Sequence, residues 1–495
     1  MIEFNNVSFF YPRCGKSALE NINLSVEEGE FLAVMGENGA GKTTFCKLIN
    51  GIIPHLSGGR LTGSVTVGGI NTIDTTVPQL AFKIGMVFDD PDAQFFTSTV
   101  RHEAAFGPEN ILLPPDEINE RVKFALSAAG LSGFEERLPS TLSGGEKQRL
   151  SVASALSMKS KILVLDEPLC RLDPKGAQEV LAVLDEIKRK YRITIIMSAH
   201  NTDKMAQYAD RVCVLKRGKI AVLDTAKKIF ANDDLLEQNG IIPLAKTKKF
   251  TMNHTNLNEA PAIKHTADSL IKNPVIEIKN FCYNYKLSGV KIENINLSIA
   301  KNDFTAVIGG NGCGKTTLLK NITGLLKPSS GDIFILGKNT KKLRISEISK
   351  EIGFVMQNPD TQLFTDSVYK EAAFALKNFR LPKEEIKTRV IDALKTAGLE
   401  DHGAFPHALS GADRTKLVIA CVIAMGTKII ILDEFDVGLD YKDSQKIMKI
   451  AQDLHSKGFT IIFVTHNMFL ACEYAHRLIK MERDGIKELF NEKFI

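Results

Sequence analysis

A glycine-rich octapeptide occurs twice in this chain, and no other feature limits its possible folds as strongly. Residues 36–43 read GENGAGKT and residues 309–316 read GGNGCGKT, so both copies fit the pattern G-x-x-x-x-G-K-[ST]. Each copy follows a short apolar run, which predicts a strand, then a loop, then a helix. In such a loop the backbone N–H groups surround phosphate oxygens, the lysine reaches the outer phosphates and the hydroxyl faces Mg²⁺. The sequence therefore predicts two nucleotide-binding sites, which we assign to Gly36, Asn38, Gly39, Gly41, Lys42, Thr43 and Thr44, and to Gly309, Asn311, Gly312, Gly314, Lys315, Thr316 and Thr317.

The repeat extends over most of the chain. ENINLS at 20–25 recurs at 293–298, and LSG at 142–144 recurs at 409–411. A repeat of this length indicates two whole domains rather than a solenoid of small units. We expect a first domain at 1–235, a linker at 236–273 and a second domain at 274–495. The polar linker could be a flexible tether or a small appendage of the first half, and the sequence leaves both open.

The composition argues against several classes of protein. A net charge of +5 over 495 residues predicts no large basic face, so we expect no nucleic-acid partner. The eight cysteines have no zinc-binding spacing, which suits reduced thiols in a cytosol, and Cys313 inside a phosphate loop is expected to react with thiol reagents. The chain opens on a strand-like run rather than a signal peptide. The longest apolar run, 417–432, is broken by Gly426, Thr427 and Lys428, so we expect a buried helix and a buried strand there.

Each half also carries an acidic pair directly after four apolar residues. ILVL precedes Asp166 and Glu167, and IIIL precedes Asp433 and Glu434. A carboxylate at the carboxyl end of a buried parallel strand lies beside the phosphate loop, where Mg²⁺ needs an anion. The adjacent glutamate can orient or deprotonate an attacking water. We therefore expect the aspartates to serve Mg²⁺ and the glutamates to serve catalysis.

The octapeptide LSGGEKQR at 142–149 lies between the first phosphate loop and its acidic pair, and with it the chain resembles ABC-type ATPases. The resemblance implies an α/β fold with two P-loop NTPase domains. Each would have a parallel core, an antiparallel β subdomain and a helical segment, near residues 90–160 and 358–427. It also implies hydrolysis of ATP with Mg²⁺ and an intramolecular head-to-tail dimer, in which each ATP lies between the phosphate loop of one half and the signature of the other. The resemblance assigns His200 and His466 as the switch histidines, which contact the outer phosphate. Tyr11 and Tyr285 would stack on adenine, or could be ordinary strand aromatics. The signature residues are Ser143, Gly144, Gly145, Ser410 and Gly411.

The halves depart from the family pattern at different positions. The second half has Gln357 where the first has Asp89, and the second signature reads LSGADR at 409–414, in which Ala412 adds a Cβ where glycine would let the backbone approach phosphate. Head-to-tail pairing would place Asp89 and the altered signature at one ATP site, where we expect slow hydrolysis; the alternative is that both sites turn over. The expected Mg²⁺ ligands are Thr43, Asp166 and Asp89 at that site and Thr316, Asp433 and Gln357 at the other, and the expected catalytic side chains are Glu434, His466, Gln357, Glu167 and His200.

A segment that follows Asp89 in the first half and Gln357 in the second resembles one particular group of ABC-type ATPases. In the first half this segment reads PDAQFF at 91–96 and EAAFGPEN at 103–110. In the second half it reads NPDTQLF at 358–364 and EAAF at 371–374. Both copies look like the ATPase subunits of energy-coupling-factor (ECF) importers for cobalt, biotin and other vitamins. In that group the segment forms a groove for the coupling helices of a transmembrane subunit, although its phenylalanines could equally be local packing. The resemblance implies two integral membrane partners, an energy-coupling subunit and a substrate-capture subunit. It places the chain as a peripheral protein on the cytoplasmic face of the cell membrane.

Two other classes of ABC protein compete with the ECF importer as interpretations of this chain. A fused ATPase of a monosaccharide importer has two ABC halves in about this length but lacks the N-P-D-x-Q segment. A soluble ABC protein acting on ribosomes usually has a long charged linker and two intact signatures. DNA-repair ABC proteins would carry zinc-binding cysteines. The cargo is not readable from this chain, so thiamine or its precursor, cobalt, biotin and riboflavin all remain open.

Overall fold

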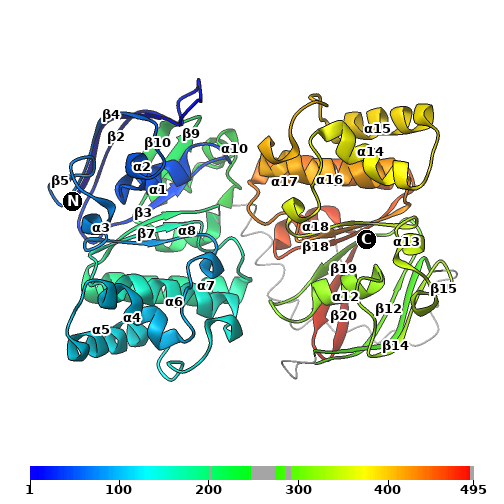
Figure 1. The fold of residues 1–495 in the computed structure, drawn as a ribbon, viewed down its shortest axis with the longest axis horizontal. Coiled ribbons are helices and arrows are strands. Elements are labelled where there is room, and N and C mark those ends of the chain that lie inside the picture. The colour runs from blue at the N-terminus through cyan, green and yellow to red at the C-terminus, as the bar shows by residue number, and fades with distance from the viewer. Residues whose placement is uncertain (201, 245, 247–273, 286–290, 491–495) are drawn as a thin grey trace. The chain divides into compact units, whose positions relative to one another are not determined.

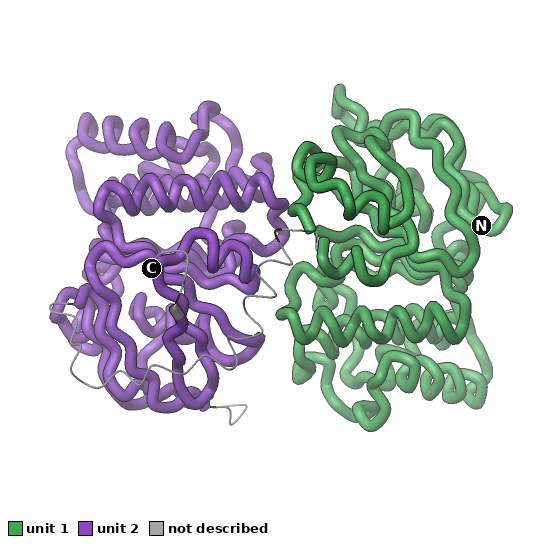
Figure 2. Tube along the Cα trace, turned by 180° about the vertical axis from the view of Figure 1, so that it is seen from behind, with its two compact units in different colours: residues 1–248 green, residues 249–495 purple. Residues whose placement is uncertain are grey.

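The structure, a computed structural model, describes residues 1–200, 202–244, 246, 274–285 and 291–490 (Figure 1). The chain divides into two compact units, residues 1–248 and 249–495 (Figure 2). Most of the expected linker at 236–273 lies outside the described residues. Its described beginning belongs to unit 1, because Leu236 and Ile241 are buried in the apolar core of that unit. Unit 1 therefore continues beyond residue 235.

Unit 1 opens with a four-stranded antiparallel sheet in the order β2-β1-β4-β5. The first strand buries Ile2 and Phe4 and then, after a register shift, Val7 and Phe9, so one face of the sheet packs on the core. Such alternation is typical of a sheet with one solvated face. The strands are β1 (Ile2–Phe10), β2 (Leu19–Val26), β4 (Arg60–Val67) and β5 (Ile70–Asn71).

A six-stranded sheet in the order β10-β9-β3-β8-β7-β6 forms the centre of unit 1. All neighbouring strands are parallel except the edge pair β10 and β9. Every residue of β3, β7 and β8 is buried, as expected for parallel strands covered on both faces. The strands are β3 (Phe31–Met35), β6 (Ile84–Val87), β7 (Ile162–Asp166), β8 (Thr194–Ser198), β9 (Arg211–Lys216) and β10 (Lys219–Thr225).

Helices of unit 1 cover the central sheet and build a separate helical segment. Helices α4, α5 and α6 pack on one another and lie side by side in Figure 1. They confirm the helical segment expected near residues 90–160. The helices are α1 (Lys42–Ile49), α2 (Ile52–His55), α3 (Val77–Leu80), α4 (Val100–Asn110), α5 (Pro115–Ala128), α6 (Gly144–Ser157), α7 (Pro174–Tyr191), α8 (Thr202–Tyr208), α9 (Ala226–Ile229) and α10 (Asp233–Gln238).

Unit 2 repeats this architecture. Its antiparallel sheet has the order β12-β11-β14-β15, and its central sheet has the order β16-β17-β18-β13-β19-β20. The strands are β11 (Ile276–Asn284), β12 (Lys291–Ile299), β13 (Phe304–Ile308), β14 (Ser330–Ile335), β15 (Lys338–Asn339), β16 (Ile352–Val355), β17 (Ile429–Asp433), β18 (Thr460–Val464), β19 (Arg477–Glu482) and β20 (Gly485–Phe490). The helices are α12 (Lys315–Ile322), α13 (Ile345–Ile348), α14 (Val368–Asn378), α15 (Lys383–Ala397), α16 (Gly411–Met425), α17 (Tyr441–Ser456) and α18 (Met468–Tyr474).

These elements confirm the predicted fold class of two α/β domains, each with an antiparallel sheet and a helical segment. The apolar run at 417–432 forms the end of α16 and then β17, a buried helix followed by a buried strand as expected. Over the described ranges, no helix is both long and apolar enough to cross a membrane.

Candidate nucleotide-binding sites

The first phosphate loop joins the end of β3 to the start of α1. Its last residue before the helix, Gly41, has φ 107°, and a Cβ there would lie 2.7 Å from Cδ2 of Leu19, so the turn requires glycine. Nζ of Lys42 donates to the carbonyl oxygens of Gly36 and Glu37 at 3.1 and 3.2 Å. The lysine is thus held over the loop at the positive end of the α1 dipole.

The second loop has the same geometry between β13 and α12. Gly314 has φ 105°, and a Cβ there would lie 2.3 Å from Cδ1 of Ile292. Nζ of Lys315 donates to the carbonyl oxygens of Gly309 and Gly310 at 3.0 and 3.1 Å. The other predicted phosphate-loop residues lie in the same loops or in the first turns of the helices that follow, namely Asn38, Gly39, Thr43, Thr44, Asn311, Gly312, Thr316 and Thr317.

In unit 1 the acidic pair lies next to the lysine of the loop. Asp166 ends β7, and the following Glu167 places Oε1 3.3 Å from Nζ of Lys42 and 3.0 Å from Nε2 of His200. Burial alone would raise the pKa of Glu167, but His200 and Lys42 outweigh it and lower this pKa to about 2. Glu167 also has φ 48°, a left-handed conformation that is uncommon for residues other than glycine and that clusters at functional sites.

Unit 2 surrounds its glutamate with one more partner. Oε1 of Glu434 lies 3.0 Å from Nε2 of His466 and 3.6 Å from Nζ of Lys315. Nε2 of Gln357 donates to Oε2 of the same glutamate at 2.6 Å. Burial opposes ionisation, yet His466 and Lys315 hold the pKa of Glu434 below its usual value. The structure therefore brings together four of the residues predicted for this site.

Asp89 does not take the place that Gln357 has in unit 2. Its side chain is exposed, and no hydrogen bond found in the described parts of the chain joins it to Glu167. Its neighbour Asp90 instead accepts a hydrogen bond from Nη1 of Arg171 at 2.6 Å. The two sites thus differ beside the glutamate, as the sequence indicates.

The aspartates of the two acidic pairs also differ in their hydrogen-bond partners. The cause is a residue that the sequence motifs did not single out. Oγ of Ser198 donates to Oδ1 of Asp166 at 2.7 Å and accepts from the backbone N of Glu167 at 2.8 Å. Val464 occupies the matching register beside Asp433, whose buried Oδ1 has no hydrogen-bond partner among the described residues. Burial raises the pKa of Asp433 to about 6 against a hydrogen bond with Thr316. Aligning the residues after the two acidic pairs would have revealed this serine-to-valine difference.

The two predicted adenine-stacking tyrosines reach the first turn of the helix after each loop. The hydroxyl of Tyr11 lies 3.1 Å from Oγ1 of Thr44, and that of Tyr285 is hydrogen-bonded to Oγ1 of Thr317. Each ring is also packed edge-to-face on an aromatic of the strand that ends just before it, Phe9 in β1 and Tyr283 in β11. Both rings therefore lie beside the phosphate loops.

The predicted signature residues lie at the N-termini of α6 and α16, where Ser143 and Ser410 are the N-caps. Both serines are exposed, whereas Gly145 and Ala412 are buried. A Cβ on Gly145 would lie 3.2 Å from Cα of Gly176 at the start of α7. The Cβ of Ala412, 3% exposed, likewise does not lie on the exposed side of its serine. The side chain at this position therefore packs inward, and the expected effect of Ala412 on the approach of phosphate stays a prediction.

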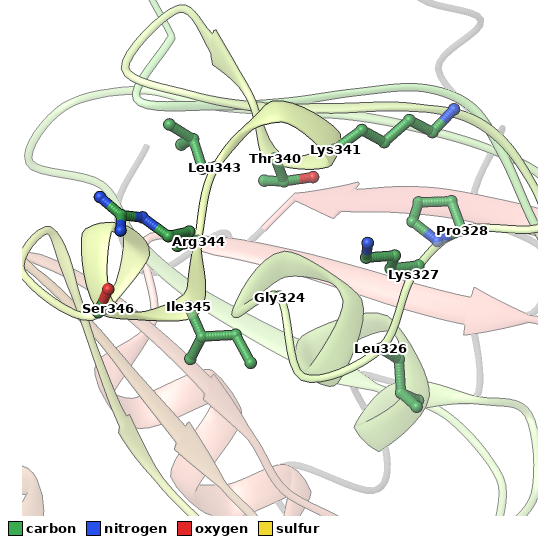
Figure 3. Close-up of a pocket in the computed structure, with 10 residues that line it drawn as sticks. All are labelled: Gly324, Leu326, Lys327, Pro328, Thr340, Lys341, Leu343, Arg344, Ile345 and Ser346. Carbon is green, nitrogen blue, oxygen red and sulfur yellow. The ribbon is translucent and has the colours of Figure 1, made fainter.

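A cavity of about 470 Å³ in unit 2 lies at the C-terminal end of α12, away from the loop at the start of that helix (Figure 3). Its wall includes Lys327, Lys341 and Arg344. Nζ of Lys341 is already bonded to the carbonyl of Gly331 at 2.6 Å, and Arg344 lies 3.5 Å from a glutamate carboxylate. In Figure 3 the charged ends of Lys341 and Arg344 point away from the centre of the cavity.

Residues 19–170 and 292–436 each match the sequence model of the family described as ABC transporter. The chain belongs to that family. It is 38% identical to an ABC transporter ATP-binding protein of Caldanaerobacter subterraneus subsp. tengcongensis, over 96% of this chain and 88% of the relative. A protein of the same description from Methanosarcina acetivorans is 34% identical over 98% of this chain and 85% of its own length. The solved structure of cbiO1 from Clostridium perfringens, described as part of the ABC transporter complex cbiONQ, is 33% identical and covers 48% of this chain and 93% of its own, with a TM-score of 0.44.

The ABC family match explains the paired sites. The chain is a tandem ABC ATPase, an ATP hydrolase that serves as the ATP-binding subunit of an ABC transporter. Such subunits work with transmembrane transporter subunits. The residues that each unit gathers at its loop have the chemistry that ATP hydrolysis needs: a lysine and a helix N-terminus for phosphate, and a carboxylate with a histidine for water.

Proposed function

We propose that this ABC ATPase energises a micronutrient importer of the ECF type, from the cytoplasmic face of the cell membrane. The observation that carries the proposal is a pair of exposed phenylalanines at the same place in both units. Phe96 and Phe106 are 75% and 42% exposed with ring centroids 5.8 Å apart, and Phe364 and Phe374 are 62% and 43% exposed with centroids 4.7 Å apart. Exposed aromatic clusters of this kind mark interaction sites. Their exposure favours docking over local packing, the alternative that the sequence left open.

A buried glutamate in each unit holds the phenylalanine loop in this outward position. Oε2 of Glu103, 4% exposed, accepts hydrogen bonds from the backbone N of Phe96 and Thr97 at 3.1 and 3.0 Å. Glu371, also 4% exposed, accepts from the backbone N of Phe364 at 3.0 Å and of the next residue at 2.7 Å. Buried carboxylates are kept only where their partners offset desolvation. Two units that preserve this arrangement support a docking role for the aromatic pair.

An ion pair links each docking segment to the helix that begins at the signature. Nζ of Lys147 in α6 donates to both carboxylate oxygens of Asp92 at 2.6 and 2.8 Å. Nη1 of Arg414 in α16 donates to both oxygens of Asp360 at 2.6 and 2.7 Å. A transmembrane subunit that pushes on the docking segment would therefore move the signature helix as well. This contact supports coupling between ATP and transport.

The residues fit Mg²⁺, which ATP hydrolysis in this family uses. The orphaned Oδ1 of Asp433, buried beside Thr316, is the kind of hard oxygen acceptor that a divalent cation takes. Thr316 and Asp433 in unit 2, with Thr43 and Asp166 in unit 1, would hold the ion, which neutralises charge on the phosphates when bound. Glu434 and Glu167 would orient the water, and His466 and His200 would contact the outer phosphate. Gln357 and Asp89 are the remaining proposed ligands, while Tyr11 and Tyr285 would stack on adenine.

The two ATP sites are proposed to be unequal, with head-to-tail pairing of the units as in the family. The site with Lys315, Gln357 and Glu434 would be completed by the intact signature Ser143-Gly144-Gly145. The site with Lys42, Asp89 and Glu167 would be completed by the altered signature that begins at Ser410 and Gly411. The first of these sites would carry most of the turnover, supported by the amide that Gln357 donates to Glu434.

The experiment is affinity purification of the tagged chain from its own cells in mild detergent, followed by mass spectrometry. We expect two dissimilar small integral membrane proteins, and the substrate-capture subunit would reveal the cargo. A Phe96→Ser/Phe364→Ser variant should lose both proteins and keep its soluble ATPase activity. Leu56→Ser is the matched control, because Leu56 is 73% exposed and lies well before the aromatic pair in sequence. Recovery of ribosomal proteins without membrane subunits would overturn the importer.

A further inference from the structure

We propose that Asp413 suppresses the ATP site served by the second signature, by binding the hydroxyl proton of Ser410. Oγ of Ser410 donates to Oδ2 of Asp413 at 2.8 Å, while the backbone N of Asp413 donates to the same Oγ at 3.1 Å. A serine hydroxyl has one proton to donate. In this arrangement the proton is directed at a carboxylate on its own helix rather than outward to a phosphate.

The first signature is arranged differently, because its glutamate is one methylene longer. Oε2 of Glu146 reaches beyond the hydroxyl of Ser143 and instead accepts a hydrogen bond from the backbone N of Ser143 at 2.7 Å. The backbone N of Glu146 donates to Oγ of Ser143 at 3.3 Å, which completes a reciprocal capping box. Within the described residues, no acceptor takes the hydroxyl proton of Ser143, so that proton is available to a ligand.

Asp413 also stays charged and fixed. Nζ of Lys416 donates to its other oxygen, Oδ1, at 2.8 Å. Burial opposes ionisation, but the hydrogen bonds from Lys416 and Ser410 keep the pKa of Asp413 below its usual value. The proton of Ser410 therefore meets an ionised acceptor, and charge-assisted hydrogen bonds of this kind are stronger than neutral ones. A phosphate oxygen that approached Ser410 would have to displace this bond beside a second negative charge.

Asp413 explains the weakened signature better than Ala412 does. The side chain at position 412 is buried, whereas Ser410 is exposed at the helix N-terminus. The substitution that changes the exposed side of the signature is thus glutamate to aspartate rather than glycine to alanine. Asp413 is a positioning residue, since it acts through Ser410 and does not itself bind ATP.

This inference rests on the proposed pairing of the units, in which Ser410 completes the site of Glu167. The test uses the full chain with Glu434→Gln, which silences the other site, so that residual hydrolysis reports on the suppressed one. In that background Asp413→Glu should raise kcat by about tenfold, the size expected for one recovered charge-assisted hydrogen bond. The matched change in the first signature, Glu146→Asp in a Glu167→Gln background, should lower kcat by a similar factor.

Ser410→Ala separates the proposed role from a merely structural one. With Ser410→Ala present, Asp413→Glu should have no effect on kcat, because the hydroxyl through which it acts is gone. A rate increase that survives Ser410→Ala, or one produced by Ala412→Gly instead, overturns the role of Asp413. If Ser410→Ala lowers the rate only in the Glu167→Gln background, the pairing itself is wrong, so the two failures are distinguishable.

A binding measurement covers the case in which residual hydrolysis is too slow to follow. In the Glu434→Gln/Glu167→Gln chain, labelled ATP with Mg²⁺ should dissociate in two phases. Asp413→Glu should slow the faster phase by about tenfold and leave the slower phase unchanged. No change in either phase would overturn the proposal.

Discussion

Gln357 donates its side-chain amide to the carboxylate of Glu434 over 2.6 Å, and no equivalent donor holds Glu167 in the described part of unit 1. The amide fixes the orientation of a carboxylate that is otherwise held by a histidine and a lysine. In unit 1 the matching position is Asp89, whose ionised carboxylate has no N–H to donate to Glu167. The two glutamates are therefore expected to differ in catalysis.

Replacing each glutamate in turn tests that difference. Glu434→Gln should nearly abolish steady-state ATP hydrolysis, because a glutamine neither orients nor deprotonates water as a carboxylate does. Glu167→Gln should reduce the rate by less than about half, since the suppressed site contributes little of the turnover. The measurement is phosphate release by the purified chain at saturating ATP and Mg²⁺. Equal losses in the two variants would contradict unequal sites.

The ion pair between Asp360 and Arg414 should matter for coupling more than for stability. Both side chains are partly exposed, so removing the pair should cost no more than about 1 kcal/mol. Arg414→Asp should leave the isolated chain active but remove the stimulation of its ATPase by the membrane partners. The charge swap Asp360→Arg/Arg414→Asp should restore part of that stimulation. The idea fails if the single variant is stimulated as strongly as the natural chain.

Ser198 should stabilise unit 1 through its two hydrogen bonds. Ser198→Ala leaves Oδ1 of Asp166 and the backbone N of Glu167 without that partner, both next to a buried strand. The expected loss in the free energy of unfolding is about 1–3 kcal/mol, measured by urea denaturation. Ser57→Ala is the control, because its exposed hydroxyl bonds only the neighbouring Gly58 carbonyl and the change should stay within about 0.5 kcal/mol. Equal midpoints for the two variants would count against this role.

Cys313 should react slowly with thiol reagents, contrary to what its place in a phosphate loop suggests. Burial raises the pKa of its thiol despite the opposing charge of Lys315, and the side chain is 8% exposed. The thiolate is the reactive form, so both effects slow alkylation. Peptide mass spectrometry after brief iodoacetamide treatment at neutral pH should find exposed Cys14 modified well before Cys313. Comparable labelling of both would contradict this expectation.

The local motifs of this chain could be read from its sequence, since each is contiguous and its chemistry depends on neighbours in the chain. The phosphate loop needs Gly41 and Lys42 at fixed spacing, because backbone geometry alone aims its N–H groups at phosphate. The acidic pairs end apolar runs, and parallel strands place such ends beside the loop. The fold class, the tandem arrangement and the grouping of Lys315, Glu434 and His466 followed from those motifs.

Contacts between distant segments were decided only by the tertiary structure. The pairing of β7 with β8 sets Ser198 beside Asp166 and, in unit 2, Val464 beside Asp433. Packing also turns the Cβ of Ala412 inward, which no spacing rule predicts. The difference between Asp413 and Glu146 depends on the reach of a single methylene at a helix N-terminus, where one side chain meets a hydroxyl and the other a backbone N–H. Sequence patterns determine which groups are present, whereas their partners depend on where folding places the rest of the chain.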